Sequence, residues 1–288
     1  MTRPGNGIGG AFGSEGIVFL PVTPGGVLRI GGGLFDVYVN AFYMGKHETT
    51  FYIGKHETTN VHYNAFVLRI GGGWFDVNVN AFYIGKHETT NAQYNAFVQS
   101  GDGFDNAAWW SDMPAMWSPP QRGLSNPWNN APDAPREISW YQSVAFTRWL
   151  HARMRAKNAD ISAGGLLVNG VEWEVRLPTE WEWQWAAQGG AEAREFPWGD
   201  WQEGHANTFE AGVGIPTAVG SYPLGAAASG ALDMSGNVWE WCLNTSKYLR
   251  GGSFGFLRES AASSFRYDPY PYGAWFPGGF RVGLFPPL

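Results

Sequence analysis

Glycine and proline restrict the fold of this chain more than any other feature of its sequence. The 288 residues include 40 glycines and 18 prolines, about a fifth of the chain. Both residue types interrupt helices and strands, so long regular elements throughout the chain are excluded. The sequence also has 16 tryptophans. Because each aromatic side chain buries about 150–250 Å², these indoles can form the core that long loops require, and we expect a loop-rich α+β domain.

Charge and cysteine content exclude several classes of protein. The net charge is −6 and no basic cluster stands out, so we expect no nucleic-acid partner. No apolar run approaches the roughly 18 residues of a membrane span, and the first residues hold no apolar stretch typical of a secretory signal. We therefore expect no membrane span and a cytoplasmic location. Cys242 is the single cysteine, which excludes an internal disulfide and multi-cysteine metal sites.

The amino-terminal part of the chain contains a duplication. Residues 27–50 and 67–90 are identical at 21 of 24 positions, and the pattern YxGKHETT occurs three times. The irregular spacing and the end of the repeats by residue 98 argue against a solenoid. We therefore expect residues 1–66 to be a tail with a duplicated segment, and residues 67–288 to form the domain.

Local patterns predict few regular elements. Alternation of apolar and polar residues predicts a strand at about 75–84, and Thr90 or Asn91 can cap a helix over 91–99. Ser139 can cap a helix over about 140–157, and Thr179 a helix over about 180–188. The Pro- and Trp-rich stretch 104–135 is expected to be a long ordered loop. Short strands are expected at 236–242, 248–254 and 279–285.

Seven ordered sequence blocks point to a family. They are FYIGKHETTNAQYNAFV (82–98), ISWYQSVAFTRWL (138–150), RLPTEWEWQWAA (176–187), FPWGD (196–200), DMSGNVWEW (233–241), RGGSF (250–254) and GFRVG (279–283). In this order they resemble the formylglycine-generating-enzyme, or sulfatase-modifying-factor, family over about residues 75–288. The resemblance implies a C-type lectin-like fold of the formylglycine-generating-enzyme type, with few helices, short twisted antiparallel strands and long loops.

The resemblance also bears on catalysis. In that family, oxidase activity depends on two cysteines after the RGGS block, whose thiolates bind copper. Phe256 and Ala261 stand where similarity would place them, and Cys242 is expected to be a small buried hydrophobe. Related iron-dependent sulfur-inserting enzymes take their iron ligands from a His-rich helical domain, and the chain has no H-x-x-x-H-x-E string. We therefore expect a non-enzymatic protein without copper or iron.

Three other catalytic patterns are incomplete. KHETTN has Asn91 or Asn60 where a zinc-binding HExxH helix needs its second histidine. GGSFG at 251–255 matches G-x-S-x-G, but no histidine follows His205, so a hydrolase triad cannot be completed in chain order. RIGGG lacks the spacing of a dinucleotide-binding loop, so its glycines are expected to form turns.

The GNVWEW string at 236–241 allows two interpretations. In the family this loop resembles a calcium site, which would use Asn237 and Glu240 as oxygen ligands. In the alternative, Asn237 satisfies backbone groups of the loop, Trp239 and Trp241 pack in the core, and Glu240 pairs with an arginine. The arginines at 250, 258, 266 and 281 are expected to pair with acidic residues or carbonyl groups.

The tract between RGGSF and GFRVG, about residues 254–278, is rich in aromatic residues but has no helix or strand period. Neighbouring side chains in extended or loop backbone point to different sides, so several of these rings must lie near the surface, where aromatic patches usually mark binding sites. The mixture of Tyr, Trp, Ser and Gly resembles an antibody paratope. The expected ligand-binding residues are Phe254, Phe256, Leu257, Glu259, Ser260, Tyr267, Asp268, Tyr270, Tyr272, Trp275 and Phe276.

A second resemblance agrees with this interpretation. Variable proteins of diversity-generating retroelements use the same lectin-like fold and place their diversified positions between an RGGS-type block and a terminal GFRV block. The resemblance implies a display scaffold that binds a protein or other macromolecule through this tract.

Two alternatives remain open. One is a degenerate enzyme or metal-dependent accessory protein, whose site could be lined by Asp200, His205, Glu210 and Asp268. The other is a structural or adhesive module, if residues 27–66 form an assembly surface.

Overall fold

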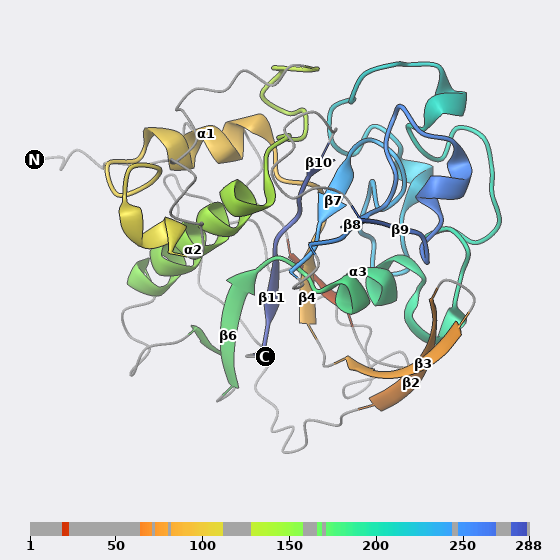
Figure 1. Cartoon of the computed structure of the whole chain (residues 1–288), viewed down its shortest axis with the longest axis horizontal. Coiled ribbons are helices and arrows are strands. Elements are labelled where there is room, and N and C mark those ends of the chain that lie inside the picture. Colours follow the sequence, from red (N-terminus) through yellow and green to blue (C-terminus); the bar gives the residue numbers. More distant parts are fainter. Residues whose placement is uncertain are drawn as a thin grey trace, which may run out of the picture.

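The computed structural model describes residues 19–22, 64–70, 73–79, 82–111, 128–157, 166–168, 171–243, 247–268 and 278–286. Within these ranges it has three α-helices, several single 3-10 turns and short strands joined by long loops. Figure 1 shows α1 and α2 at one side of the molecule, and β7, β8 and β9 with long loops at the other. The loop-rich α+β fold expected from the composition is confirmed.

A five-stranded antiparallel sheet joins distant parts of the chain. Its order is β1 (Phe19–Val22), β4 (Phe82–Gly85), β11 (Gly283–Phe285), β6 (Val171–Arg176) and β5 (Leu166–Val168). The central strand is β11, in which Gly283 pairs with Ile84 on one side and with Arg176 on the other. The carboxy-terminal strand therefore joins the two halves of the sheet.

A smaller sheet supports the carboxy-terminal tract. Its order is β10 (Gly278–Gly279), β7 (Trp239–Trp241), β8 (Leu249–Arg250) and β9 (Arg266–Tyr267). The β10–β7 pair is parallel and the others are antiparallel. Separately, β2 (Asn64–Ile70) and β3 (Gly73–Val79) form a hairpin.

The helices begin at side-chain caps. Thr90 caps α1 (Asn91–Gln99) in a capping box with Gln93, and Thr179 caps α3 (Glu180–Ala187) in a capping box with Glu182. The Ser139 hydroxyl hydrogen-bonds to Gln142 at the start of α2 (Trp140–Lys157). The 3-10 turns are η2 (Ala107–Trp110), η3 (Gly190–Glu192), η4 (Phe209–Ala211), η5 (Pro223–Gly225) and η6 (Arg258–Ala261).

Indole rings fill much of the core, as the composition predicted. The buried side chains form two apolar clusters. The first packs α1 and α2 against β6, β7 and β11, and the second packs α3 against β4 and β11. Five tryptophans are among the largest fully buried side chains: Trp149, Trp183, Trp185, Trp239 and Trp241.

Some predicted elements differ from the structure. The strand expected at 75–84 is two strands, because β3 ends at Val79 and β4 begins at Phe82. The loop expected over 104–135 includes η2. The strand expected at 248–254 ends at Arg250, since Gly251 and Gly252 adopt positive φ angles of 90° and 71° that turn the chain. The β5–β6 hairpin was not predicted.

Candidate ligand-binding surface

A buried tryptophan lies beneath the described part of the carboxy-terminal tract. Trp239 is fully buried in β7, and three rings of the tract surround it: Phe256, Phe265 and Tyr267, with centroids 5.4, 6.0 and 5.6 Å from the indole. Phe256 and Tyr267 are half-buried, while Phe265 is exposed. These four residues, called here the Trp239 cluster, hold the tract against the small sheet, and solvent reaches Phe265 and part of Phe256 and Tyr267.

Other residues of the tract are open to solvent. Leu257 is 55% exposed, Glu259 and Asp268 are exposed, and Ser260 is half-buried. They lie in or beside η6 and at the end of β9. The described tract therefore presents one aliphatic and two acidic side chains beside the Trp239 cluster.

Phe254 differs from its expected position on the ligand surface. It is buried, and its ring packs edge-on against Trp128 at 5.3 Å. Trp128 is itself 44% exposed. Phe254 therefore supports the surface from below, and Trp128 is the ring that solvent reaches.

Four predicted ligand-binding residues lie outside the described residues. They are Tyr270, Tyr272, Trp275 and Phe276. Their part in ligand binding stays a prediction.

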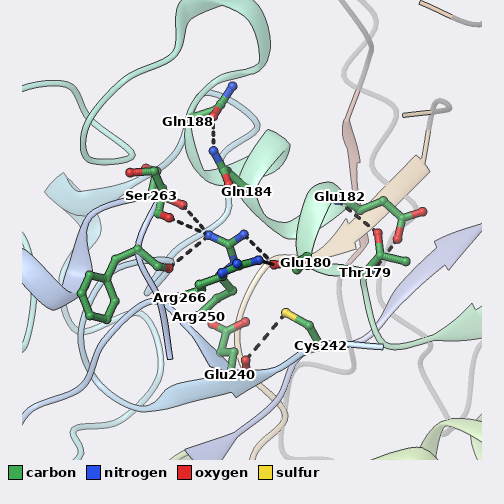
Figure 2. A network of polar contacts seen from close by, with 12 residues as sticks. Thr179, Glu180, Glu182, Gln184, Gln188, Glu240, Cys242, Arg250, Ser263 and Arg266 are labelled. Atoms are coloured by element: carbon green, nitrogen blue, oxygen red, sulfur yellow. Dashed lines mark hydrogen bonds and ion pairs between the residues drawn. The ribbon is translucent and has the colours of Figure 1, made fainter. Parts of the chain in front are cut away.

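Arg250 fixes the tract to α3. Its side chain is fully buried, with Nη2 at 3.1 Å from Glu180 Oε2. Its Nη1 donates to the carbonyls of Ser263, Ser264 and Phe265 at 3.5, 3.0 and 3.1 Å. Figure 2 shows Arg250 between Glu180 and Ser263. One guanidinium thus fixes the backbone that carries Phe265 and leads into β9.

The residues of the predicted calcium site make contacts within the protein. Arg281 forms a bidentate pair with Glu240, with both N–O distances 2.6 Å, and Trp183 Nε1 donates to Glu240 Oε2 at 2.8 Å. Asn237 Oδ1 accepts hydrogen bonds from Thr217 N and Oγ1. The structure therefore has the alternative arrangement, in which Glu240 pairs with an arginine.

These contacts determine whether the Glu240 and Asn237 side chains could bind a cation. Both Glu240 oxygens and the Asn237 oxygen already accept hydrogen bonds, so as they lie the two side chains do not fit a calcium site. Among the described residues, no group of three or more His, Cys, Asp or Glu side chains could hold a metal ion. Calcium binding itself stays a prediction.

Two more buried carboxyl groups, those of Glu88 and Asp233, lie near Asn237 and Glu240. Glu88 is 1% exposed, and its Oε1 accepts from Asn237 Nδ2 at 3.1 Å. Burial, and then the nearby Asp233 and Glu240 charges, raise the pKa of Glu88 well above its usual value. Burial also raises the pKa of Asp233, to about 6, although Gly220 N donates to its Oδ2 and Arg281 lies near. Burial thus favours the protonated forms of Glu88 and Asp233.

The family's thiol chemistry has no counterpart in the described site. Cys242 is fully buried, its Sγ lies 3.8 Å from the Glu240 carbonyl oxygen, and burial raises the pKa of its thiol well above the usual value. Phe256 belongs to the Trp239 cluster, and Ala261 is fully buried, with its carbonyl accepting from Ser235 Oγ. No reactive thiolate is therefore expected here.

The acidic and histidine residues of the alternative enzyme site have separate neighbours. His205 packs against Trp198 at 5.3 Å, and its Nδ1 lies 3.2 Å from the Glu203 carbonyl oxygen. Glu210 Oε1 accepts from the Arg258 backbone N–H at 2.9 Å. Asp200 and Asp268 are exposed.

Several exposed apolar residues outside the tract were not predicted from the sequence. Besides Leu257 and Phe265, the large exposed apolar side chains of the described residues are Trp128, Phe209, Val213, Ile215 and Leu224. They come from loops without hydrophobic periodicity, so no sequence pattern distinguishes an exposed ring there from a buried one.

No helix within the described ranges is both long enough and apolar enough to cross a bilayer.

Sequence comparison assigns the chain to one domain type. A model of the sulfatase-modifying factor enzyme 1-like domain matches residues 21–283. The chain is 37% identical over 176 residues to hercynine oxygenase of Mycolicibacterium smegmatis, covering 56% of this chain and 36% of that protein. It is 33% identical over 153 residues to formylglycine-generating enzyme of Streptomyces coelicolor, covering 47% of this chain and 40% of that protein. The chain thus spans well under half the length of these two relatives.

Solved structures share the fold. Treponema denticola variable protein 1 superposes with a TM-score of 0.54 at 20% identity, covering 79% of this chain and 93% of that one. PvdO from Pseudomonas aeruginosa gives a TM-score of 0.53 at 20% identity, covering 77% and 92%. At this identity the likeness concerns the fold alone.

Proposed function

The chain belongs to the sulfatase-modifying factor enzyme 1-like family, and we propose that it uses this fold as a non-enzymatic binding scaffold. In this role it is a variable protein of a diversity-generating retroelement. The tract at about 254–278 is the binding surface, and its ligand is a protein or other macromolecule.

The observation that carries this proposal is the contrast between the base of the tract and its surface. Trp239 and Arg250 are fully buried and fix the backbone, while Leu257, Glu259 and Asp268 point into solvent. Substitutions at exposed positions away from special features usually change stability by about 0.5 kcal/mol or less. Such an arrangement lets the surface vary while the framework stays folded.

Two further findings support the proposal. The thiol pair of the oxidase chemistry is absent from the sequence, which has Cys242 alone. A protein named as a variable protein shares the fold.

A genomic observation tests the origin of the tract. We expect a near-copy of the DNA that encodes residues 250–283, differing mainly where the copy has adenine, together with a reverse transcriptase gene. A complete genomic neighbourhood with neither feature would contradict the retroelement assignment.

A mutational library tests the separation of stability from binding. Leu257, Glu259, Ser260 and Asp268 are randomised together, and the variants are sorted first for folding and then for binding to a panel of immobilised proteins. We expect most variants to fold and different variants to bind different proteins. Frequent unfolding, or binding that ignores the randomised residues, would refute the assignment.

A second candidate, a metal-dependent enzyme, is favoured by the names of the relatives. Hercynine oxygenase and formylglycine-generating enzyme both match over about half of this chain. Elemental analysis of the purified protein separates the two candidates. Stoichiometric iron or copper would favour catalysis, whereas their absence after purification without chelators would favour the binding scaffold.

A further inference from the structure

Exposed apolar side chains gather in one part of the described chain. Among the side chains that the structure describes, all seven large apolar ones that are exposed belong to Trp128 or to residues 209–265, and none belongs to α1 or α2. Figure 1 shows the loops of residues 200–265 together at one side of the molecule, around β7, β8 and β9. Apolar patches that stay exposed commonly mark interaction sites.

Hydrogen bonds join three separate segments at this side. The Phe209 backbone N–H donates to the Phe256 carbonyl at 2.9 Å. Asn129 Nδ2 donates to the Pro216 carbonyl at 2.9 Å, and the Trp128 ring packs on Phe254. The segments 128–129, 209–216 and 254–258 therefore border one another.

Four exposed apolar residues lie on these segments: Trp128 (44% exposed), Phe209 (63%), Ile215 (44%) and Leu257 (55%). We call them the composite surface. Only Leu257 belongs to the carboxy-terminal tract, so three of the four come from loops outside it.

The charges around the composite surface are mainly acidic. The exposed acidic residues of the segments 199–216 and 254–268 are Asp200, Glu203, Glu210, Glu259 and Asp268. The same segments have two exposed arginines, Arg258 at 3.2 Å from Glu259 and Arg266 at 3.4 Å from the buried Glu180, so exposed acidic groups outnumber exposed arginines by five to two. A partner of complementary charge must therefore supply cations around an apolar centre.

We propose that the composite surface binds a polypeptide that presents apolar side chains flanked by Lys or Arg. Trp128, Phe209 and Ile215 form a constant part of the binding site, and Leu257 with the rest of the tract forms its variable part. This inference rests on the proposed binding function and extends it to loops outside the tract. A few well-packed residues near the centre of an interface carry most of the binding free energy, while rim charges set specificity and association rate.

The test uses a displayed library of random peptides, selected on the full chain. We expect the enriched peptides to combine aromatic or aliphatic residues with Lys or Arg, and their binding to weaken as salt concentration rises. Enriched peptides that are acidic or carry no charge would overturn the proposed partner chemistry. Enrichment no greater than on a Phe209→Ser, Leu257→Ser double variant would overturn both this inference and the proposed function.

Single variants then separate the inference from the proposed function. With an enriched peptide as probe, Phe209→Ser and Leu257→Ser are each expected to raise Kd by about fivefold or more. Phe209→Leu, which keeps an apolar side chain, is expected to retain most of the affinity. The matched control is Leu224→Ser on η5, at a side chain that is 68% exposed, and it is expected to change Kd by less than about twofold.

The outcomes are distinct. If Leu257→Ser weakens binding and Phe209→Ser does not, the binding function stands and the composite surface is overturned. If neither variant weakens binding, the proposed binding function and the composite surface are both overturned. If Leu224→Ser weakens binding as much as Phe209→Ser, the loss of any exposed apolar side chain weakens binding to the same extent. The composite surface is then overturned.

Discussion

Arg281 and Glu240 form a bidentate ion pair in the centre of the molecule, with both side chains at most 1% exposed. Arg281 also donates to the carbonyls of Gly85 and Leu232, so this guanidinium joins β4 and the loop before β7 to the carboxy-terminal segment. The Glu240 carboxylate in turn accepts from Trp183 in α3. One ion pair thus holds together elements that lie far apart in the sequence.

Replacing Glu240 with Gln should therefore destabilise the protein strongly. The variant keeps the shape of the side chain but removes the carboxylate that pairs with the buried Arg281, a change that typically costs about 3–5 kcal/mol. Glu259→Gln is the matched control, since Glu259 forms an exposed pair with Arg258 that is worth about 1 kcal/mol or less. Chemical denaturation measures both variants.

Thermal unfolding tests whether the protein binds calcium. Because Glu240 and Asn237 already accept hydrogen bonds from the protein, we expect added calcium or a calcium chelator to leave the Tm of the wild-type protein unchanged. A rise in Tm with calcium that disappears in Glu240→Gln would contradict this arrangement and support the calcium site, which was one of the two interpretations of the sequence.

The buried acids make stability fall as pH rises. Asp233 has its pKa raised from 3.8 to about 6 in the folded protein, and the pKa of Glu88 is raised further above its usual value. In this pH range the folded state holds more protons than the unfolded state, so their stabilising contribution is complete below about pH 4 and is lost as pH rises through the folded pKa values. His87, with a pKa lowered to about 4 by burial and then by Arg281 and Lys86, has the opposite effect between pH 4 and 6.5.

The variant Glu88→Gln isolates this contribution. Gln keeps an oxygen for Asn237 Nδ2 and cannot ionise, so the decline of the free energy of unfolding between pH 5 and 8 should be less steep than in the wild type. Denaturation across this range, with Glu259→Gln as the control, gives the comparison. An unchanged pH profile would show that Glu88 does not hold an additional proton in the folded state.

Local elements were predictable from the sequence, and long-range contacts were not. The cap at Thr179 was expected because a capping box needs only residues three positions apart, and of the two candidates Thr90 and Asn91 the structure has Thr90 as the cap of α1. The β5–β6 hairpin was missed, although Asn169-Gly170 between apolar runs is a hairpin signal.

In the candidate site, too, local features could be predicted and long-range contacts could not. The aromatic tract could be recognised from its composition, but the contact of Arg250 with Glu180 spans 70 residues and leaves no local pattern. The exposure of Phe209 is likewise set by the way the loops pack, which the sequence does not encode in any period.

The cap of α3 gives a quantitative test of a local prediction. The Thr179 hydroxyl accepts from Glu182 N, and Glu182 Oε2 accepts from Thr179 N at 2.7 Å. Thr179→Ala should cost about 1 kcal/mol of stability, and Thr179→Ser should restore most of it. Thermal unfolding of the two variants and of the wild type measures these differences in stability. Equal losses in both would point to the Thr methyl group rather than to the hydroxyl.

The several hydrogen-bond donors of the Arg250 guanidinium, and not only its charge, should keep the tract ordered. In Arg250→Lys the charge remains, but a single ammonium cannot reach both Glu180 and the carbonyls of residues 263–265. We expect faster amide hydrogen exchange at residues 263–267 and weaker binding of any ligand of the tract. Exchange in α1, which lies in the other half of the molecule, should change less, and a uniform increase across the chain would indicate global destabilisation instead.

The framework and the surface of the tract should respond differently to substitution. Trp239 is fully buried beneath three rings, and truncating a buried aromatic residue to Ala typically costs about 3–5 kcal/mol. Leu257 and Glu259 are exposed, so Leu257→Ser and Glu259→Ser should each change the free energy of unfolding by about 0.5 kcal/mol or less. Denaturant titration of the three variants measures this difference. If Leu257→Ser proved as costly as Trp239→Ala, residue 257 would belong to the framework, and a surface free to vary would have to lie elsewhere.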